Sequence, residues 1–315
     1  VKQKYSIKVD KHFKWKNTSI RREKKKFMQE ILNYFSKNLY NVLSKILIQN
    51  TTSNLQENIE EIRVRINRPL ILRLRNDDIC INYTVTEEDI LQTLEKICEN
   101  SLYAYKKQIS EGYITIKGGH RVGLTGTGVI ENEEIINIKY ISSLNFRIAR
   151  EVKGCSKHIL KEIIDKENNT IFNTVIVSPP GKGKTTMLRD IIRNLSNGIE
   201  ELSFKGKNCG VVDERGEIAA CYRGIPQKDV GIRTDVIENV SKEKGILMLI
   251  RSMAPEIIAC DEIGSAQDVQ VIEKAVISGV KGIFTMHGKT IEDVKNNKDI
   301  NRLIEKNILE KIIFI

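Results

Sequence analysis

The nine residues SPPGKGKTT, 178–186, constrain this chain more than any other feature, because the apolar run FNTVIV precedes them and the helical pattern MLRDIIRNL follows. Strand, glycine loop and helix in this order build a pocket for a nucleoside triphosphate. Gly181 and Gly183 let backbone N–H groups point inward, and the helix N-terminus adds the positive end of its dipole. Ser178 stands where the usual pattern has its first glycine. The alternative interpretation is a chance glycine-rich turn.

The loop residues divide into those that hold phosphate and those that hold metal. We expect Lys184 to reach the β and γ oxygens of ATP and Thr185 to offer its hydroxyl to Mg²⁺, which prefers oxygen ligands. The expected nucleotide-binding residues are Ser178, Pro179, Pro180, Gly181, Lys182, Gly183, Lys184, Thr185 and Thr186.

A second motif, APEIIACDEIG, covers residues 254–264. Residues 257–260 predict a buried parallel strand, which delivers Asp261 and Glu262 to the carboxyl end of the sheet, where ligands of open α/β sheets bind. We expect Asp261 to hold the hydration shell of Mg²⁺ and Glu262 to orient and polarise the attacking water as a base. An acidic helix N-cap after a core strand is the alternative.

A third apolar strand, GIFTMHG at 282–288, ends in polar side chains. We expect this strand to lie between the other two, which is where a γ-phosphate sensor belongs in such ATPases. His287 or Thr285 is the candidate for that role, and a strand-end cap is the alternative.

The segments between these motifs carry further charges. NCGVVDERGEIAACYRG, 208–224, predicts a strand and a turn that crowds Asp213, Glu214 and Glu217 near the same edge, and GIRTDVI, 231–237, predicts a loop. These charges could contact metal, water or a neighbouring subunit's phosphate, or they could lie in ordinary solvated loops.

Composition indicates two domains of a soluble intracellular protein. The chain has 315 residues and lacks an uninterrupted apolar stretch of about 18 residues. Six cysteines form no C-x-x-C pair, which favours reduced, small core residues. The net charge of +10 belongs to the first 50 residues, which hold 13 Lys or Arg against 3 Asp or Glu. We expect residues 1–27 to form a basic flexible arm and the fold to open at Met28.

The region after this arm predicts an α+β domain. EIRVRINRPLILRLR alternates as two antiparallel strands joined at NRP, with apolar side chains on one face and Arg63, Arg65, Arg73 and Arg75 on the other. A helix over 84–112, capped by Thr84 or Thr86, and a hairpin reversing at Gly118 and Gly119 follow. We expect the N-terminal domain at 28–150 and the α/β nucleotide domain at 151–315.

Taken together, these motifs resemble the stage III sporulation protein AA family of endospore-forming bacteria, over nearly everything from Met28 onward. That family is similar to the ATPases of type II and type IV secretion. The resemblance implies a RecA-like P-loop ATPase domain with a parallel-rich sheet behind a smaller domain, assembled as a homo-oligomer, usually a hexameric ring. Lys184 and Thr185 match its Walker A residues, Asp261 and Glu262 its Walker B pair, and His287 its histidine element.

The resemblance also implies a role and a place in the cell. It implies an ATP-hydrolysing motor or assembly factor, cytoplasmic and peripheral to the membrane on the mother-cell side, docked to integral-membrane sporulation channel proteins facing the forespore. An arginine from the N-terminal domain or linker would reach the nucleotide, and the candidates are Arg121, Arg147 and Arg150. Arg215 and Arg233 join them as arginines that a neighbouring subunit could supply. Two alternatives stay open: a nucleic-acid-dependent ATPase, which the neutral charge of residues 51–315 disfavours, and a nucleotide-gated scaffold with little turnover.

Overall fold

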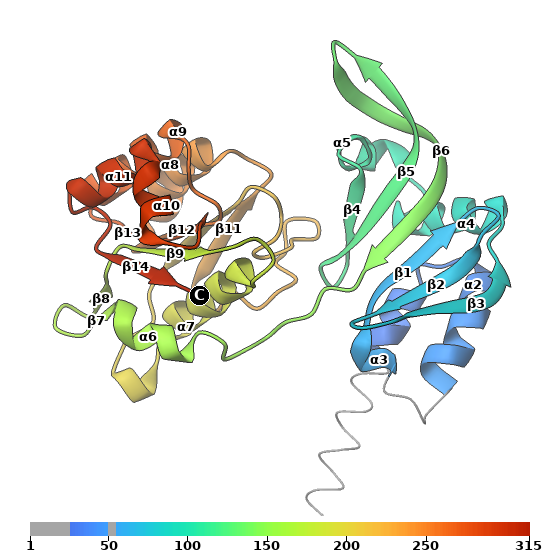
Figure 1. Ribbon diagram of the computed structural model, residues 1–315, viewed down its shortest axis with the longest axis horizontal. Helices are drawn as coiled ribbons and strands as arrows, with labels where there is room; N and C mark the ends of the chain where they lie inside the picture. The colour runs from blue at the N-terminus through green and yellow to red at the C-terminus, as the bar shows by residue number, and fades with distance from the viewer. Residues whose placement is uncertain (1–25, 50–54) are drawn as a thin grey trace, which may run out of the picture. The chain divides into compact units, whose positions relative to one another are not determined.

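The computed structural model describes residues 26–49 and 55–315, so the expected arm at 1–27 lies almost entirely outside the described residues. The chain divides into two compact units, coloured from blue to green and from green to red in Figure 1. Unit 1 extends to Ala149 and unit 2 begins at Arg150, except that the turn Lys117–Gly119 groups with unit 2. Among the described residues, no helix combines the length and the apolar character needed to cross a membrane.

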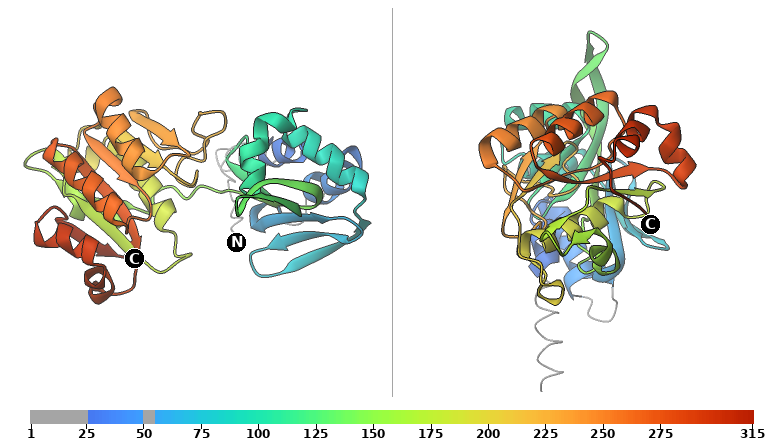
Figure 2. Two further views of the ribbon diagram at one scale, coloured as in Figure 1. Left: turned by 90° about the horizontal axis from the view of Figure 1, so that it is seen from above. Right: turned by 90° about the vertical axis from the view of Figure 1, so that its left-hand side faces the viewer.

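Unit 1 is an antiparallel sheet whose helices cover one face (Figure 2). Strand order is β3-β2-β1-β6-β5-β4. The period-two alternation places Ile62, Val64, Leu70 and Leu72 in the core, as the sequence predicts. The strands are β1 Ile59–Arg65, β2 Pro69–Leu74, β3 Asp78–Thr84, β4 Tyr113–Ile116, β5 His120–Glu131 and β6 Glu134–Arg147. The helical elements are residues 26–32, α2 Lys37–Ser44, η1 Lys45–Gln49, α3 Leu55–Asn58, α4 Glu87–Ile97, η2 Leu102–Tyr105 and α5 Lys106–Ser110.

The single helix expected over 84–112 is wrong, because the segment breaks into α4, η2 and α5. Glu99 and Asn100 both have left-handed backbone, with φ of 50° and 61°, and an α-helix cannot continue through such residues. Thr86, one of the two expected caps, accepts a hydrogen bond from the backbone N–H of Asp89, and the Asp89 carboxylate accepts one from the backbone N–H of Thr86.

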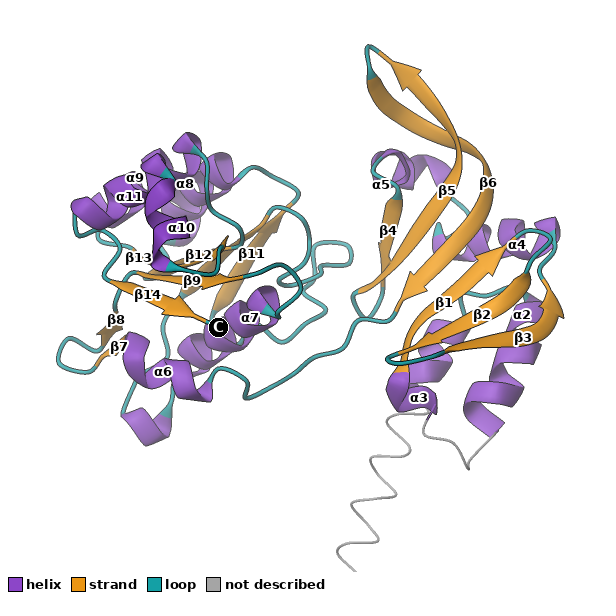
Figure 3. Cartoon of the chain, viewed as in Figure 1, coloured by secondary structure: helices purple, strands orange, loops and turns teal. Residues whose placement is uncertain are grey.

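Unit 2 is a parallel six-stranded sheet with helices on both faces (Figure 3). Strand order is β11-β10-β12-β13-β9-β14, so β13 lies between the phosphate-loop strand β9 and the acidic strand β12, as predicted. Successive residues of each central strand face opposite cores: Ile176 belongs to the core that includes α6 and α7, and Val177 belongs to the core that includes α8 and α9. The predicted RecA-like α/β architecture is confirmed.

The elements of unit 2 follow the predicted order with one exception. The expected loop at 231–237 contains the start of an edge strand, β11, which pairs with β10 from Thr234 onward. The strands are β7 Ile164–Asp165, β8 Thr170–Ile171, β9 Thr174–Ser178, β10 Cys209–Asp213, β11 Thr234–Glu238, β12 Ile257–Cys260, β13 Lys281–His287 and β14 Lys311–Phe314. The helices are α6 Lys157–Ile163, α7 Lys184–Asn197, η3 Glu200–Leu202, α8 Lys242–Met253, α9 Ala266–Ile277, α10 Ile291–Asn296 and α11 Lys298–Glu305.

Candidate nucleotide-binding site

The phosphate loop joins the end of β9 to the start of α7. Gly181 and Gly183 have φ of 75° and 89°, a left-handed backbone that side-chain-bearing residues rarely adopt. Among the described residues other than the adjoining ones in the chain, no atom lies within 4 Å of a Cβ added at either position, so conformation, not crowding, calls for glycine there. Gly183 is also the N-cap of α7, and the first N–H groups of a helix with such a cap are available to an anion.

The remaining loop residues surround this turn in different ways. Ser178 is buried as the last residue of β9, whereas Pro180 and Lys182 are exposed and Pro179 is half-buried. Thr186 lies half-buried on α7, one residue after Thr185. A buried serine therefore stands where the usual pattern has its first glycine, and the turn still forms after it.

Lys184 is buried, and its ammonium is held inside the loop. Its Nζ donates to the carbonyl oxygens of Ser178 at 3.0 Å and Pro179 at 3.3 Å, and lies 2.9 Å from Nδ1 of His287. Burial lowers the pKa of Lys184 below its usual value, although the carboxylates of Asp261 and Glu262 act in the opposite direction. The cation is thus desolvated at the place where phosphate oxygens would enter.

Asp261, just past β12, accepts hydrogen bonds from two threonine hydroxyls. Thr185 Oγ1 donates to Asp261 Oδ2, and Thr285 Oγ1 donates to Asp261 Oδ1. A hydroxyl and a carboxylate are hard oxygen donors that suit Mg²⁺. Within the described ranges, no group of three or more His, Cys, Asp or Glu side chains is arranged to hold a metal ion. The hydroxyl of Thr185 and the carboxylate of Asp261 would suit an ion that takes one or two protein ligands and completes its shell with phosphate and water.

Glu262 adopts a left-handed backbone, φ 53°, that is unusual for this residue type. Its N–H donates to Thr285 Oγ1 at 2.9 Å and to Asp261 Oδ1 at 3.1 Å. Its carboxylate lies between two cationic or polar groups: Oε1 is 2.9 Å from His287 Nε2, and Oε2 is 2.5 Å from Arg215 Nη1. The strained turn thus directs this carboxylate toward the His287 end of the site.

The acidic stretch that begins at the last residue of β10 makes two kinds of contact. Asp213 is buried, and its carboxylate accepts the backbone N–H groups of residues 217–220, at 2.7–3.3 Å. Glu214 instead pairs with Lys242 of α8 at 2.5 Å. Arg189 of α7 donates to the carbonyl oxygen of Glu217 at 2.6 Å and also to that of Ile218. The phosphate-loop helix and the acidic stretch are therefore tied together.

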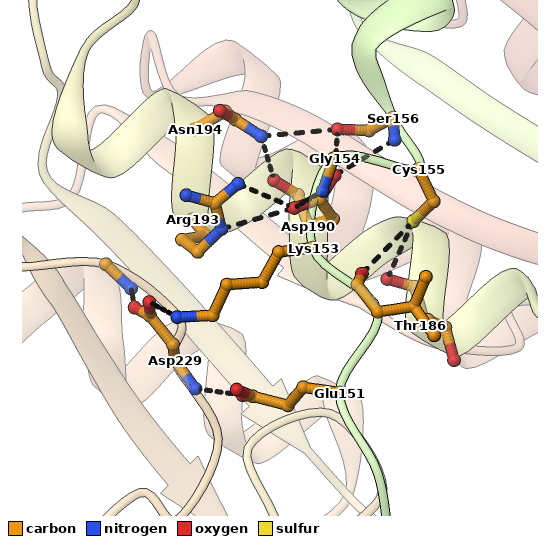
Figure 4. Close-up of polar contacts among 12 residues, drawn as sticks. Glu151, Lys153, Gly154, Cys155, Ser156, Thr186, Asp190, Arg193, Asn194 and Asp229 are labelled. Atoms are coloured by element: carbon orange, nitrogen blue, oxygen red, sulfur yellow. Dashed lines mark hydrogen bonds and ion pairs between the residues drawn. The ribbon is translucent and has the colours of Figure 1, made fainter. Parts of the chain in front are cut away.

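Sequence reasoning missed the part that Asp190 plays on the same helix (Figure 4). Its carboxylate accepts the N–H of Gly154 at 3.0 Å, the N–H and hydroxyl of Ser156 at 2.9 and 2.7 Å, and Arg193 at 2.7 Å. Burial alone raises the pKa of Asp190, but these hydrogen bonds outweigh it and hold the pKa at about 2. The segment entering unit 2 is thereby fixed to α7. The sequence gives no clear signal for this role, because neighbours one turn away on α7, Thr186, Arg193 and Asn194, are polar too.

The arginine candidates are spread over the chain. Arg121 and Arg147 belong to unit 1 and Arg150 to unit 2. Arg215 contacts Glu262 of its own chain, and Arg233 donates to the carbonyl oxygen of Ser196 at 2.9 Å. Which arginine reaches a nucleotide remains a prediction.

Comparison with known proteins identifies a family and individual relatives of this chain. The chain matches the family described as "Sporulation stage III, protein AA" over residues 24–315. It is 38% identical over 286 residues to the stage III sporulation protein AA of Bacillus subtilis (strain 168), covering 91% of this chain and 90% of that protein. The protein SEEDLING PLASTID DEVELOPMENT 1 of Arabidopsis thaliana is 27% identical over 166 residues, 52% of this chain and 22% of its own length.

Solved structures agree with the fold. The Legionella pneumophila ATPase DotB matches with a TM-score of 0.53 and 16% identity, covering 81% of this chain and 70% of that chain. The pilus retraction motor PilT, solved with ADP, matches with a TM-score of 0.55 and 14% identity, covering 81% and 74%. At sequence identities this low, the structural likeness shows that the fold is shared.

Proposed function

The chain belongs to the sporulation stage III, protein AA family, and from that premise we propose that it is an Mg²⁺-dependent ATPase that drives or assembles a channel complex between mother cell and forespore. One observation carries the proposal. Lys184, His287 and Glu262 form a continuous contact chain with steps of 2.9 Å, and they come from the ends of neighbouring strands or the helix that follows. The chain links a phosphate-binding cation to a carboxylate suited to orient water.

The residues of this site divide the work by their chemistry. Lys184 and the loop N–H groups bind the triphosphate, and Thr185 with Asp261 holds Mg²⁺. The bound ion neutralises charge on the phosphate oxygens. Glu262 orients the attacking water, and His287, which contacts both Lys184 and Glu262, responds to the γ-phosphate. Thr285 holds the turn in place, because its hydroxyl accepts a hydrogen bond from the Glu262 N–H and donates one to the Asp261 carboxylate.

The proposal also concerns the oligomeric state of the protein and its location in the cell. We propose a homo-oligomer, hexameric as a working value, with an arginine from a neighbouring subunit stabilising the charge that develops on phosphate. The proposed partners are integral-membrane sporulation channel proteins, contacted from the cytoplasmic, mother-cell side. Family membership supports this, as does the fold shared with a pilus retraction motor.

Two variants test the chemical step. Because Glu262 is assigned to water and Lys184 to phosphate, Glu262→Gln should keep ATP binding while hydrolysis falls about 100- to 10,000-fold. Lys184→Ala should lose binding as well. Equilibrium binding of a fluorescent ATP analogue and phosphate release would be measured on both. Equal loss of binding in the two variants would remove Glu262 from the base role.

A second candidate, the nucleic-acid-dependent ATPase, has one observation in its favour. Arg63, Arg65, Arg121 and Arg147 line a hollow of about 590 Å³ on the sheet of unit 1. Glu61 offsets part of that charge, since it contacts Arg63 at 2.6 Å and Arg147 at 4.0 Å. Phosphate release with and without single-stranded DNA at near-physiological salt distinguishes the two functions. We expect no stimulation.

A further inference from the structure

The hairpin of β5 and β6 extends past the rest of its sheet (Figure 1), and its tip carries isoleucine and glutamate residues. In the part of the chain that the structure describes, strand β1 pairs with β6 only up to Ser143, and β4 pairs with β5 only up to Gly123. At the tip, Ile130 and Ile135 are direct cross-strand partners, and they are 68% and 52% exposed. A projecting hairpin with an exposed isoleucine pair has the features of a contact element.

The charges at this tip are arranged unfavourably for an isolated unit. Glu131 and Glu134 stand directly opposite each other, and like charges in that position destabilise a strand pair. Glu133 occupies the turn with φ of 66°, a conformation that favours glycine or asparagine. Three carboxylates thus gather within four residues, where a cationic partner surface would relieve their repulsion.

A groove with complementary features lies on the same unit. It has a volume of about 920 Å³ and lies between α4, the η2–α5 segment and β6. Its apolar lining includes Leu91, Leu102 and two tyrosines, Tyr103 and Tyr140, that are 88% and 85% exposed. Its charged lining consists of Lys106, Lys139 and Glu87. The groove therefore presents apolar surface and a net positive charge, the converse of the acidic tip.

The tip cannot fill the groove of its own chain. Residues 137–142 of β6 form one wall of that groove, and the tip continues the same strand. A paired strand extends about 3.3 Å per residue in one direction and does not pack against itself. Only another molecule can bring such a tip into this groove.

We propose that the hairpin tip of one subunit docks into the α4–α5–β6 groove of a second copy of this chain. Ile130 and Ile135 contact the groove's leucines and tyrosines, and the three glutamates lie near Lys106 and Lys139. Because two different surfaces meet, the contact is heterologous and repeats from subunit to subunit, as a ring requires. The inference rests on the homo-oligomer of the proposed function, but it concerns a surface of unit 1 alone.

A charge exchange on the full-length protein tests this contact. The tip variant Glu133→Lys/Glu134→Lys and the groove variant Lys106→Glu/Lys139→Glu should each raise the midpoint concentration of assembly at least about 10-fold, because each places like charges opposite one another. The protein carrying all four substitutions restores opposite charges and should return to within about 3-fold of the wild type. Sedimentation velocity over a dilution series with Mg²⁺ and ATP provides the midpoint.

Matched controls separate this contact from general charge effects and from the ATPase proposal. Glu200→Lys/Glu201→Lys on η3 makes the same change of charge on unit 2 and should leave the midpoint unchanged. ATP binding should be the same in all of these variants. Unaltered assembly of the tip variant, or failure of the fourfold variant to recover, overturns the docking. A wild type that stays monomeric while it binds ATP also overturns it, leaves the nucleotide site standing, and makes the groove a site for a different partner.

Discussion

Strands β10 and β12 lie side by side in the parallel sheet, and each runs from apolar residues into an Asp-Glu pair: Asp213-Glu214 and Asp261-Glu262. The partners of the two pairs differ. Asp213 accepts four backbone N–H groups, whereas Asp261 accepts two threonine hydroxyls and a single backbone N–H, that of Glu262. Glu214 contacts a lysine, and Glu262 contacts His287 and Arg215.

This difference indicates which pair supports the fold and which pair can bind a ligand. A carboxylate that satisfies buried amides cannot give them up without leaving those amides unpaired. A carboxylate held by side chains from other elements can exchange those partners for a ligand. The pair at the end of β10 therefore supports a loop, and the pair after β12 can exchange its partners for a ligand.

The largest effect on hydrolysis is expected from a substitution at Asp261, the first acid of the pair after β12. We expect Asp261→Ala to reduce hydrolysis about 1,000-fold, because the variant loses the carboxylate proposed to hold Mg²⁺. Its free energy of unfolding should change by less than about 1 kcal/mol, since the partners lost are two hydroxyls and the Glu262 N–H, which keeps its bond to Thr285. Phosphate release and thermal unfolding on the same preparation check both statements. A variant that hydrolyses ATP normally would show that the metal is held elsewhere.

The corresponding change at Asp213 should act on stability. Asp213→Ala leaves four N–H groups of residues 217–220 without their acceptor, which should lower the free energy of unfolding by about 3 kcal/mol. Asp213→Asn, which keeps a carbonyl acceptor, should lose less. Denaturant unfolding of both variants measures the difference. If Asp213→Ala unfolds like the wild type, the carboxylate does not support the loop.

The smallest effect is expected at the second acid of the β10 pair. Glu214→Gln removes a partly exposed ion pair with Lys242 and should cost no more than about 1 kcal/mol. Its hydrolysis rate should stay within about 3-fold of the wild type, in contrast to Glu262→Gln. Steady-state phosphate release compares the two. A loss at Glu214 as large as that at Glu262 would place both pairs in the reaction.

Several elements of the site could be predicted because their causes are local. The glycine loop follows from φ angles that glycine adopts readily, and the strands before it follow from continuous apolar runs. The cap at Thr86 follows from a hydroxyl placed three residues before a carboxylate. The order of β12, β13 and β9 also agreed with expectation. By contrast, the break after α4 depended on two residues that take an unfavourable backbone, which helical periodicity does not reveal.

By itself, the sequence determined the strand-loop-helix order of the candidate site and the two sets of residues proposed to carry its chemistry, since backbone preference and apolar periodicity act over a few neighbouring residues. Only the tertiary structure decided that Asp213 accepts four backbone N–H groups and that Asp190 holds the segment entering unit 2. It also decided that a hairpin tip and a groove of opposite character lie on unit 1. The contact of Lys184 with His287 joins residues 103 positions apart. Such contacts depend on how strands and helices pack, and packing depends on the whole core.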